Sequence, residues 1–379
     1  MSEPRKKICM LVATPLTIHF FLKPHLMALS KNHDVTLMVN LKSDSYVLPL
    51  GLPIDIIDIG ISRKMAPISD LICLVKLFFL FRKAKYDLLI TVVPKAGLLG
   101  MLAGVVARIP QRLHIFQGEV WAHLDGFSRK FFKTCDWITA TLATDVLAVS
   151  QSEKQFLIRQ GVILPDKISV IGKGSIGGVD IERFSNGLSL RKKVRSDLKI
   201  PEDAVALIFL GRLVRDKGIY QLVTAFKNIA KFDRRLWLLL IGPDEELEFD
   251  NLCLGNLAVQ SVRAPFTANP EVYLAASDIL VLPSFREGFG VVIIEAAAMG
   301  LPSIGSNIYG ISDAIIDQET GLLFECGSSA QLQYCIQSLL DSKNLRARMG
   351  AAAYRNAKEN FKSNEVVAGY VSHISNLLK

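Results

Sequence analysis

The sequence lacks several signatures that would assign it to common protein classes. No run of eighteen apolar residues without a charge occurs in the 379-residue chain, and the longest candidate, AGLLGMLAGVV from Ala96, is too short to cross a bilayer. No C-x-x-C pair, Walker sequence G-x-x-x-x-G-K-[ST], D-x-D motif, internal repeat or low-complexity tract is present. These absences argue against a membrane-spanning chain, a P-loop nucleotidase and a disulfide or zinc framework.

The few cysteines are expected to be free, buried thiols, because they mostly lie in apolar runs. The N-terminus, MSEPRKKICMLVATP, has basic residues and then a short apolar run without a small-residue cleavage site, so that run is expected to be a first strand. We therefore expect a cytoplasmic protein. The six cysteines are Cys9, Cys73, Cys135, Cys253, Cys326 and Cys335.

Positive charge is concentrated in the first half of the chain. Residues 1–190 contain 23 Lys and Arg against 15 Asp and Glu, whereas residues 191–379 contain 21 of each. A basic half suggests attraction to an anionic membrane surface, a nucleic acid or a phosphorylated substrate, and a solvated surface without a partner is the alternative. No nucleic-acid partner is expected, because neither a dense basic arm nor an aromatic RNA-binding signature is present.

Strand-like apolar runs alternate with helical patterns almost from end to end, which predicts parallel sheets with helices on both faces. The pattern breaks at residues 172–187, GKGSIGGVDIERFSNG, which we interpret as an interdomain linker or hinge. We expect an α/β protein with two doubly wound domains facing a cleft, residues 1–180 and 181–360. A final helix within residues 361–379 is expected to pack back on the first domain.

Several individual elements are predicted from these patterns. Helices are expected from Phe20 to Ser30 and near Asp244, among others. The segment from Asp70 to Lys85, DLICLVKLFFLFRKAK, is compatible with insertion into a membrane surface, but a helix between two strands must cover the sheet, so we expect a core helix with a basic end. The expected strands are KICMLVA, DVTLMV, DIIDIG, DLLITVV, RLHIF, VLAVS and KISVIG in the first domain, and AVALIFLG, RLWLLLIG, SVRAPF and ILVLPS in the second.

Two glutamates, Glu287 and Glu295, lie around a Gly-Phe-Gly turn in SFREGFGVVIIEAAAMG. The run ILVLPS before them predicts a buried parallel strand, and VVIIEAAAMG predicts a helix that begins near Gly290. Backbone N–H groups at such a helix end favour an anion, and the two carboxylates can accept hydrogen bonds from sugar hydroxyls. Two solvated surface glutamates are the alternative.

Two cations follow the first strand of the second domain in FLGRLVRDKGIYQL. Arg212 and Lys217 lie in a strand-to-helix loop, where a guanidinium fork and an ammonium group suit a diphosphate. Exposed loop cations without a ligand are the alternative for this pair alone. Both this loop and the glutamate loop are expected at carboxyl ends of strands, where parallel sheets bind ligands.

The succession GRLVRDKG, LLLIGPDEE, APF and LPSFREGFGVVIIEAAAMGLPSIGS resembles the nucleotide-sugar domain of the family 4 retaining glycosyltransferases, which have the GT-B fold. The resemblance implies that Glu287 contacts the donor sugar and Glu295 the ribose, and that Arg212 and Lys217 hold the diphosphate. It also implies further donor contacts from the backbone after the first glutamate and from the segment APF. The remaining donor-site residues are Gly288, Phe289, Gly290, Val291 and Pro265.

The first half of the chain, with TVVPKAGLLGMLAG, HIFQGEVWA and VIGKGSIGGVDIERF, resembles enzymes that extend undecaprenyl-diphosphate-linked sugars in bacterial O-antigen, capsule and N-glycan assembly. The resemblance implies a UDP-sugar donor, with GalNAc as the specific expectation, and a polyprenyl-diphosphate-linked acceptor at the inner membrane surface. No cofactor or metal is expected. The acceptor-site residues implied are Thr14, Thr17, His19, Lys95, Gln117 and Glu119.

The chain departs from many family members at two places. The glycine-rich loop after the first strand is replaced by ATPLTIHFF, and the histidine that often follows the strand RLHIF is replaced by Gln117. A general acid–base role at Gln117 is therefore not expected, and His114 is expected to be a core histidine. A soluble-acceptor transferase, a nucleotide-sugar epimerase of the same fold and a non-catalytic nucleotide-sugar-binding protein remain alternatives.

Overall fold

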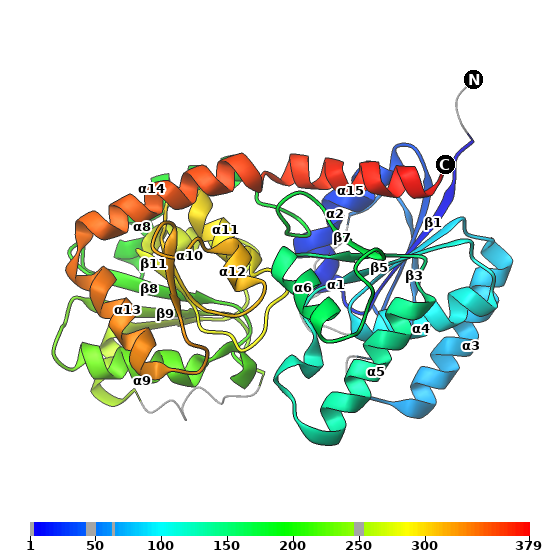
Figure 1. The fold of residues 1–379 in the computed structure, drawn as a ribbon. Helices are drawn as coiled ribbons and strands as arrows, with labels where there is room; N and C mark the ends of the chain where they lie inside the picture. Colours follow the sequence, from blue (N-terminus) through cyan, green and yellow to red (C-terminus); the bar gives the residue numbers. More distant parts are fainter. Residues whose placement is uncertain (1–3, 43–50, 63–64, 246–253) are drawn as a thin grey trace. The chain divides into compact units, whose positions relative to one another are not determined.

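The computed structural model describes residues 4–42, 51–62, 65–245 and 254–379, apart from the side chains of residues 186 and 188 (Figure 1). The chain divides into two compact units. Unit 1 contains Met1–Gly177 and Asn364–Lys379, and unit 2 contains Gly178–Ser363. Each unit is an α/β layer structure with its own parallel sheet, so the expected fold class is confirmed.

The sheet of unit 1 has seven strands in the order β3-β2-β1-β4-β5-β6-β7, and every neighbouring pair is parallel. Its central strands are apolar runs whose side chains are buried on both faces, as helices on both sides of a parallel sheet require. The strands are β1 (Lys7–Val12), β2 (Asp34–Val39), β3 (Asp55–Asp58), β4 (Leu88–Val92), β5 (Gln111–Phe116), β6 (Asp145–Ala148) and β7 (Ile168–Val170).

Helices connect these strands and cover the sheet, and the last helix of the chain returns to this unit. On α3, Cys73, Leu77 and Phe81 are buried against the sheet, so the expected core helix is confirmed for this face. No described helix is both long enough and apolar enough to span a membrane. The helices are α1 (Pro15–Thr17), the π-helix η1 (Ile18–Leu22), α2 (Lys23–Ser30), α3 (Pro67–Ala84), α4 (Pro94–Val106), the 3-10 helix η2 (Val120–His123), α5 (Gly126–Leu142), α6 (Gln151–Arg159) and α15 (Ser363–Leu377).

The sheet of unit 2 has six strands in the order β10-β9-β8-β11-β12-β13, again all parallel. The strands are β8 (Val205–Leu210), β9 (Leu236–Ile241), β10 (Ser261–Ala264), β11 (Ile279–Leu282), β12 (Ser303–Ser306) and β13 (Gly321–Phe324). The helices are α7 (Ile181–Gly187), η3 (Leu188–Leu190), α8 (Arg191–Asp197), η4 (Arg215–Lys217), α9 (Ile219–Ala230), η6 (Gly255–Gln260), α10 (Pro270–Ala276), α11 (Val291–Ala298), α12 (Ile311–Ala314), α13 (Ser329–Asp341) and α14 (Lys343–Asn360).

Two predicted boundaries are wrong for identifiable local reasons. The first helical region begins at Pro15 and not at Phe20, because the Thr14 side chain caps the helix and proline suits its first position. The predicted linker, residues 172–187, is irregular only in its first part. Its second part is helix α7, which Asp180 caps by accepting the N–H of Arg183, and in which Phe184 is buried.

Strands β12 and β13 carry no recognisable signal in the sequence. Each has four residues and contains glycine; β12 shows neither an apolar run nor alternation, and the apolar run of β13 is shorter than the four residues that predict a strand. Their places in the second sheet, β12 between β11 and β13 and β13 at the edge, are decided by pairing with neighbouring strands. The helix predicted near Asp244 falls largely on residues 246–253, which lie outside the described part of the chain, as does Cys253.

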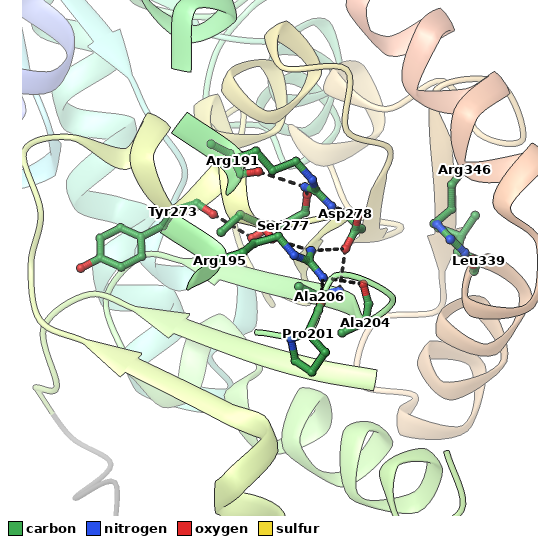
Figure 2. Close-up of polar contacts among 12 residues, drawn as sticks. Arg191, Arg195, Pro201, Ala204, Ala206, Tyr273, Ser277, Asp278, Leu339 and Arg346 are labelled. Carbon is green, nitrogen blue, oxygen red and sulfur yellow. Dashed lines mark hydrogen bonds and ion pairs between the residues drawn. The ribbon is translucent and has the colours of Figure 1, made fainter. Parts of the chain in front are cut away.

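A buried ionic cluster fastens helix α8 to the amino end of the second sheet. Figure 2 shows Arg191 and Arg195 of α8 pointing toward Asp278. The guanidinium of Arg191 lies 2.6 Å from one carboxylate oxygen of Asp278, and that of Arg195 lies 3.2 Å from the other. Asp278 also accepts the N–H of Ala206 on β8 at 2.8 Å, and Arg195 donates to the carbonyl of Ala204 at 2.8 Å. Because these groups are largely removed from water, the cluster sets the position of β8 and β11, whose opposite ends form the site below.

Candidate functional site

The two loops predicted to bind the donor follow adjacent strands of unit 2. Strands β8 and β11 pair directly, and the chain order reverses between them, since β9 and β10 lie on one side of β8 and β11 to β13 on the other. The carboxyl ends of strands at such a reversal leave a crevice, which is where open α/β sheets bind ligands. The prediction that both loops lie at the carboxyl ends of strands of one sheet is confirmed.

Lys217 and Glu287 form an ion pair across the two loops. The Lys217 Nζ lies 2.5 Å from the Glu287 Oε1, which also accepts the Ser284 hydroxyl at 3.0 Å. Both charged side chains are largely buried, with 17% and 16% exposed. The pair holds a cation and a carboxylate at fixed positions, and each retains donors or acceptors for a ligand.

The loops approach each other so closely that only glycine fits at one position. Gly218 has φ +71°, and a Cβ there would lie 2.0 Å from the carbonyl oxygen of Pro283. A third loop, after β12, touches the same place, since a Cβ at Gly310 would lie 2.5 Å from the carbonyl oxygen of Glu287. The site is therefore a convergence of three strand-to-helix loops.

Sequence reasoning missed the contacts that join the first two loops. The N–H of Phe285 donates to the carbonyl of Asp216 at 2.8 Å, and Arg286 forms an ion pair with the Asp216 carboxylate at 3.0 Å. Asp216 directly precedes Lys217, and Arg286 directly precedes Glu287. Opposite charges beside each predicted site residue were the available signal, but their pairing depends on the strand order.

The turn between Glu287 and helix α11 is formed as predicted. Gly290 caps α11 with φ +74°, and Val291, four positions after Glu287, is the first helical residue, so the N–H groups that begin this helix have no carbonyl partner one turn earlier in it. The side chain of Phe289 does not reach this site, because it is 3% exposed and its ring packs on Phe361 at 5.2 Å. Gly288 and Phe289 can therefore contribute only through their backbones.

Arg212 and Pro265 lie at the same sheet edge, on the β9 side of the site. The Arg212 guanidinium pairs with Glu245 at 2.8 Å, and both side chains are more than one-third exposed. Pro265 is exposed directly after β10, two strands from β8. Arg212 is accordingly less firmly held than Lys217.

Glu295 lies in a different electrostatic environment from Glu287. It is half-buried on α11, and burial raises the pKa of its carboxyl group to about 7. Arg183 lowers this pKa and Glu271 raises it further, and these two residues pair with each other at 2.8 Å. Glu295 is therefore a carboxyl group with mixed protonation near neutral pH, next to helices α7 and α10.

The residues predicted for the acceptor lie in unit 1, at the carboxyl edge of its sheet. Thr14 is 3% exposed and caps α1, with its Oγ1 3.1 Å from that of Thr17. His19 is half-buried in the π-helical turn η1, a form of helix that often marks functional sites. Thr14 thus has a structural role already, whereas Thr17 and His19 are both partly accessible.

Lys95, Gln117 and Glu119 follow the neighbouring strands β4 and β5. The Lys95 Nζ pairs with Asp70 of α3 at 2.7 Å. The backbone N–H of Gly118, between Gln117 and Glu119, donates to the carboxylate of the buried Glu153 at 2.5 Å, and this hydrogen bond fixes the loop. Glu119 is fully buried, so its side chain does not face solvent.

Two subsidiary expectations, for His114 and for the cysteines, are tested by the structure. His114 is 1% exposed on β5 and contacts Thr91 at 2.8 Å, and burial lowers its pKa to about 3, so it is a core histidine as expected. Every cysteine in the described part of the chain is free, as expected; Cys9, Cys73 and Cys335 are buried, whereas Cys135 and Cys326 are only half-buried. Among the described residues there is no cluster of three or more His, Cys, Asp or Glu side chains suited to a metal ion.

Comparison of the sequence with known proteins identifies one family and several related enzymes. Residues 191–356 match the family described as glycosyl transferases group 1. The capsular polysaccharide biosynthesis glycosyltransferase CapM of Staphylococcus aureus is 30% identical over 308 residues, which cover 80% of each chain. The UDP-Gal:alpha-D-GlcNAc-diphosphoundecaprenol alpha-1,3-galactosyltransferase of Escherichia coli is 27% identical over 289 residues, which cover 75% of this chain and 74% of that enzyme.

Solved structures match over nearly the whole chain. Anabaena Alr3699/HepE in complex with UDP and glucose gives a TM-score of 0.81 at 19% identity, covering 98% of this chain and 100% of that one. WaaG, a glycosyltransferase involved in lipopolysaccharide biosynthesis, gives 0.75 at 14% identity, covering 96% and 98%. At these identities the likeness shows the fold alone, and that fold is GT-B, as expected.

Proposed function

This chain belongs to the glycosyl transferases group 1 family, and from that premise we propose that it transfers a hexosyl or N-acetylhexosaminyl group, with retention, from a UDP-sugar to a polyprenyl-diphosphate-linked saccharide in bacterial polysaccharide assembly. The observation that carries the proposal is the Lys217–Glu287 pair at the β8–β11 reversal, beside the amino end of α11. A cation, a carboxylate and free backbone N–H groups at one point suit a sugar joined to a diphosphate.

The relatives support the choice of substrates. The Escherichia coli relative is named for a UDP-sugar donor and a diphosphoundecaprenol acceptor, and the Staphylococcus aureus relative for capsular polysaccharide biosynthesis. An acceptor of this kind is anionic and lipid-linked, which agrees with the positive charge of residues 1–190. We propose that the enzyme works on the cytoplasmic side of the membrane and that GalNAc is the sugar transferred.

The proposed chemistry assigns one task to each group of the site. Departure of the diphosphate leaves negative charge on its oxygens, which Lys217, Arg212 and the N–H groups at the start of α11 stabilise. Glu287 accepts hydrogen bonds from hydroxyls of the sugar, which gains positive charge as the anomeric bond breaks. Glu295 accepts hydrogen bonds from the ribose. The incoming acceptor hydroxyl attacks from the face that the diphosphate leaves and gives its proton to an oxygen of the departing diphosphate, which retains the anomeric configuration without a covalent intermediate on Glu287.

The test incubates the purified protein with radiolabelled UDP-GalNAc, UDP-GlcNAc, UDP-galactose and UDP-glucose and with short-chain polyprenyl-diphosphate saccharides, with and without EDTA. We expect transfer with one donor, no loss in EDTA, and a product whose NMR spectrum shows the anomeric configuration of the donor. UDP binding without transfer in any combination would overturn the enzymatic proposal. An inverted anomer contradicts retention, and a UDP-sugar epimer formed without acceptor favours the epimerase alternative.

A further inference from the structure

Helix α3 has a second apolar face, opposite to the one that covers the sheet. Residues two positions apart project from nearly opposite sides of a helix. The side chains two positions before and after the buried Cys73 and Leu77 therefore face outward, away from the sheet. Five large apolar residues form this outward face over more than three turns. They are Ile68, Leu71, Ile72, Val75 and Phe79, with exposed fractions of 80%, 62%, 64%, 49% and 64%.

Helix α5 presents a similar outward face. Phe127, Phe131 and Trp137 are 82%, 40% and 50% exposed, although large aromatic side chains are normally covered. The rings of Phe127 and Phe131 stack on each other at 6.4 Å, so they form one apolar surface. Lys130 is exposed between them. An exposed aromatic stripe beside lysine is typical of helices that lie at a lipid–water interface.

The two helices belong to one side of the unit 1 sheet. Helix α3 packs against α4, and α4 packs against α5. Figure 1 shows the three helices side by side below the sheet, and α4 ends in Val106, which is 64% exposed. The outward faces of α3 and α5 are therefore neighbouring parts of one surface, with α4 between them.

The exposed charges of the three helices themselves are all positive, and exposed Asp58, whose backbone carbonyl accepts from Lys76 at 3.0 Å, lies at the margin. The three helices contain two carboxylates, Asp70 and Asp136, and neither is available to solvent as a free charge. Asp70 pairs with Lys95 at 2.7 Å, and Asp136 is 3% exposed and accepts the indole N–H of Trp121 at 2.7 Å. Asp125, which precedes α5, is exposed at the margin. The exposed cations of the three helices are Lys76, Arg82, Lys83 and Lys130.

We propose that the outward faces of α3 and α5 dock on an anionic lipid bilayer, with the apolar side chains in the interface and the exposed cations at the headgroups. A second copy of the chain is a poorer occupant, because a twofold contact would bring the same cations against each other. The inference deepens the proposed function by naming the surface that meets the membrane of a lipid-linked acceptor. Lys95, which pairs with α3, would then lie near the bilayer edge.

The first experiment needs no sugar substrate. The full chain is sedimented with vesicles of phosphatidylcholine alone, or of phosphatidylcholine and phosphatidylglycerol in equal parts, at low salt and at about 1 M salt. We expect binding to the anionic vesicles at low salt and weaker binding at high salt. Equal binding to both kinds of vesicle, or no binding to either, overturns the proposal.

The second experiment assigns binding to the surface. Ile72→Ser combined with Phe79→Ser should weaken vesicle binding at least tenfold, and Lys83→Gln about fivefold at low salt. Phe232→Ser, at a 91% exposed phenylalanine in unit 2, is the matched control and should bind as the wild type does. Unchanged binding of the double variant contradicts the proposal.

Two further measurements keep the outcomes distinct. Light scattering that shows a dimer in the wild type and a monomer in the double variant would assign the surface to a second copy instead. Transfer to a water-soluble acceptor analogue should be the same in the double variant and the wild type, because both substitutions change exposed side chains of α3 and none of the residues proposed to bind donor or acceptor. Loss of vesicle binding by the double variant, with transfer retained, therefore supports this inference. Absence of transfer by the wild type would overturn the proposed function and would leave the vesicle result unaffected.

Discussion

At the scale of the residue, the site depends on which charges meet. Lys217 and Glu287 are seventy positions apart in the chain, and each alone has the properties of an ordinary surface charge. Their contact at 2.5 Å, with both side chains largely buried, is what distinguishes them from Arg212 and Glu245, which pair at 2.8 Å but remain more than one-third exposed. Water screens the Arg212–Glu245 pair more strongly, so the Lys217–Glu287 pair holds its two charges in more fixed positions for catalysis.

Replacing Lys217 tests this assignment. Lys217→Ala should lower kcat about 10²- to 10³-fold, because a preorganised cation at the leaving diphosphate would be lost. Steady-state transfer assays measure the effect, with the exposed Lys231→Ala as a control that should keep wild-type activity. A Lys217→Ala enzyme with more than half of the wild-type kcat would remove Lys217 from the proposed mechanism.

The carboxyl group of Glu295 predicts a dependence of stability on pH. Its pKa rises from 4.5 to about 7 on folding, chiefly through burial, so between these values the folded state holds the proton that the unfolded state has lost. The contribution of Glu295 to the free energy of unfolding therefore falls as pH rises through this window and is constant above it. Glu295→Gln removes that contribution.

Thermal unfolding measures this effect as a difference between proteins. The melting temperature of Glu295→Gln, relative to the wild type, should be higher at pH about 8 than at pH about 5, and Glu319→Gln, at an exposed position, should show no such trend. A constant difference across the window would contradict the raised pKa.

Glu295→Ala tests the proposed contact with the ribose. It should weaken UDP binding, because the carboxylate that accepts hydrogen bonds from the ribose is lost. Calorimetry measures the affinity for UDP, and an unchanged affinity would contradict the assignment.

At the scale of the element, the position of the site follows from strand order. The apolar runs of β8 and β11 predict buried strands, and the residues after them predict loops, but adjacency of the two strands comes from pairing across the sheet. The short strands β12 and β13 show the opposite case, since their apolar runs are too short to predict a strand. The first loop closes on Pro283 only because Gly218 has no side chain.

The ionic cluster at the amino end of the sheet should contribute strongly to stability. Asp278→Ala leaves Arg195, which is 4% exposed, without its carboxylate partner and should lower the free energy of unfolding by about 3 kcal/mol. Urea denaturation measures the change. Asp233→Ala, which breaks the pair with the half-exposed Arg235, is the matched control and should cost less than about 1 kcal/mol. Equal losses would show that burial of the cluster does not matter.

At the scale of the whole molecule, the C-terminal helix joins the ends of the chain into one unit. Helix α15 buries Tyr370, Val366 and Ile374 in unit 1, although unit 2 lies between them in sequence. The Tyr370 hydroxyl donates to the carbonyl of Ser175 at 3.2 Å, and its ring packs edge-on against His25 at 5.1 Å. Unit 1 is therefore complete only when residues 364–379 have been made.

Tyr370→Ala should destabilise unit 1 and leave unit 2 largely intact. Loss of a fully buried ring of this size costs about 3–5 kcal/mol, and the cavity lies in unit 1 alone. Hydrogen exchange should show faster exchange in β1 to β7, with little change in β8 to β13 and with UDP binding retained. Tyr334→Ala, at a 74% exposed tyrosine, should leave both units unchanged. Uniform acceleration in both sheets would argue against separate units.

The sequence by itself determined the alternation of strands and helices, the two-unit plan and the residue types at the donor loops, because these depend on local apolar periodicity and on loops at strand ends. Only the tertiary structure decided which charges pair, that Glu295 is half-buried near Arg183 and that α3 is apolar on both faces. These properties depend on contacts between segments far apart in the chain, and no local pattern records which segments will meet.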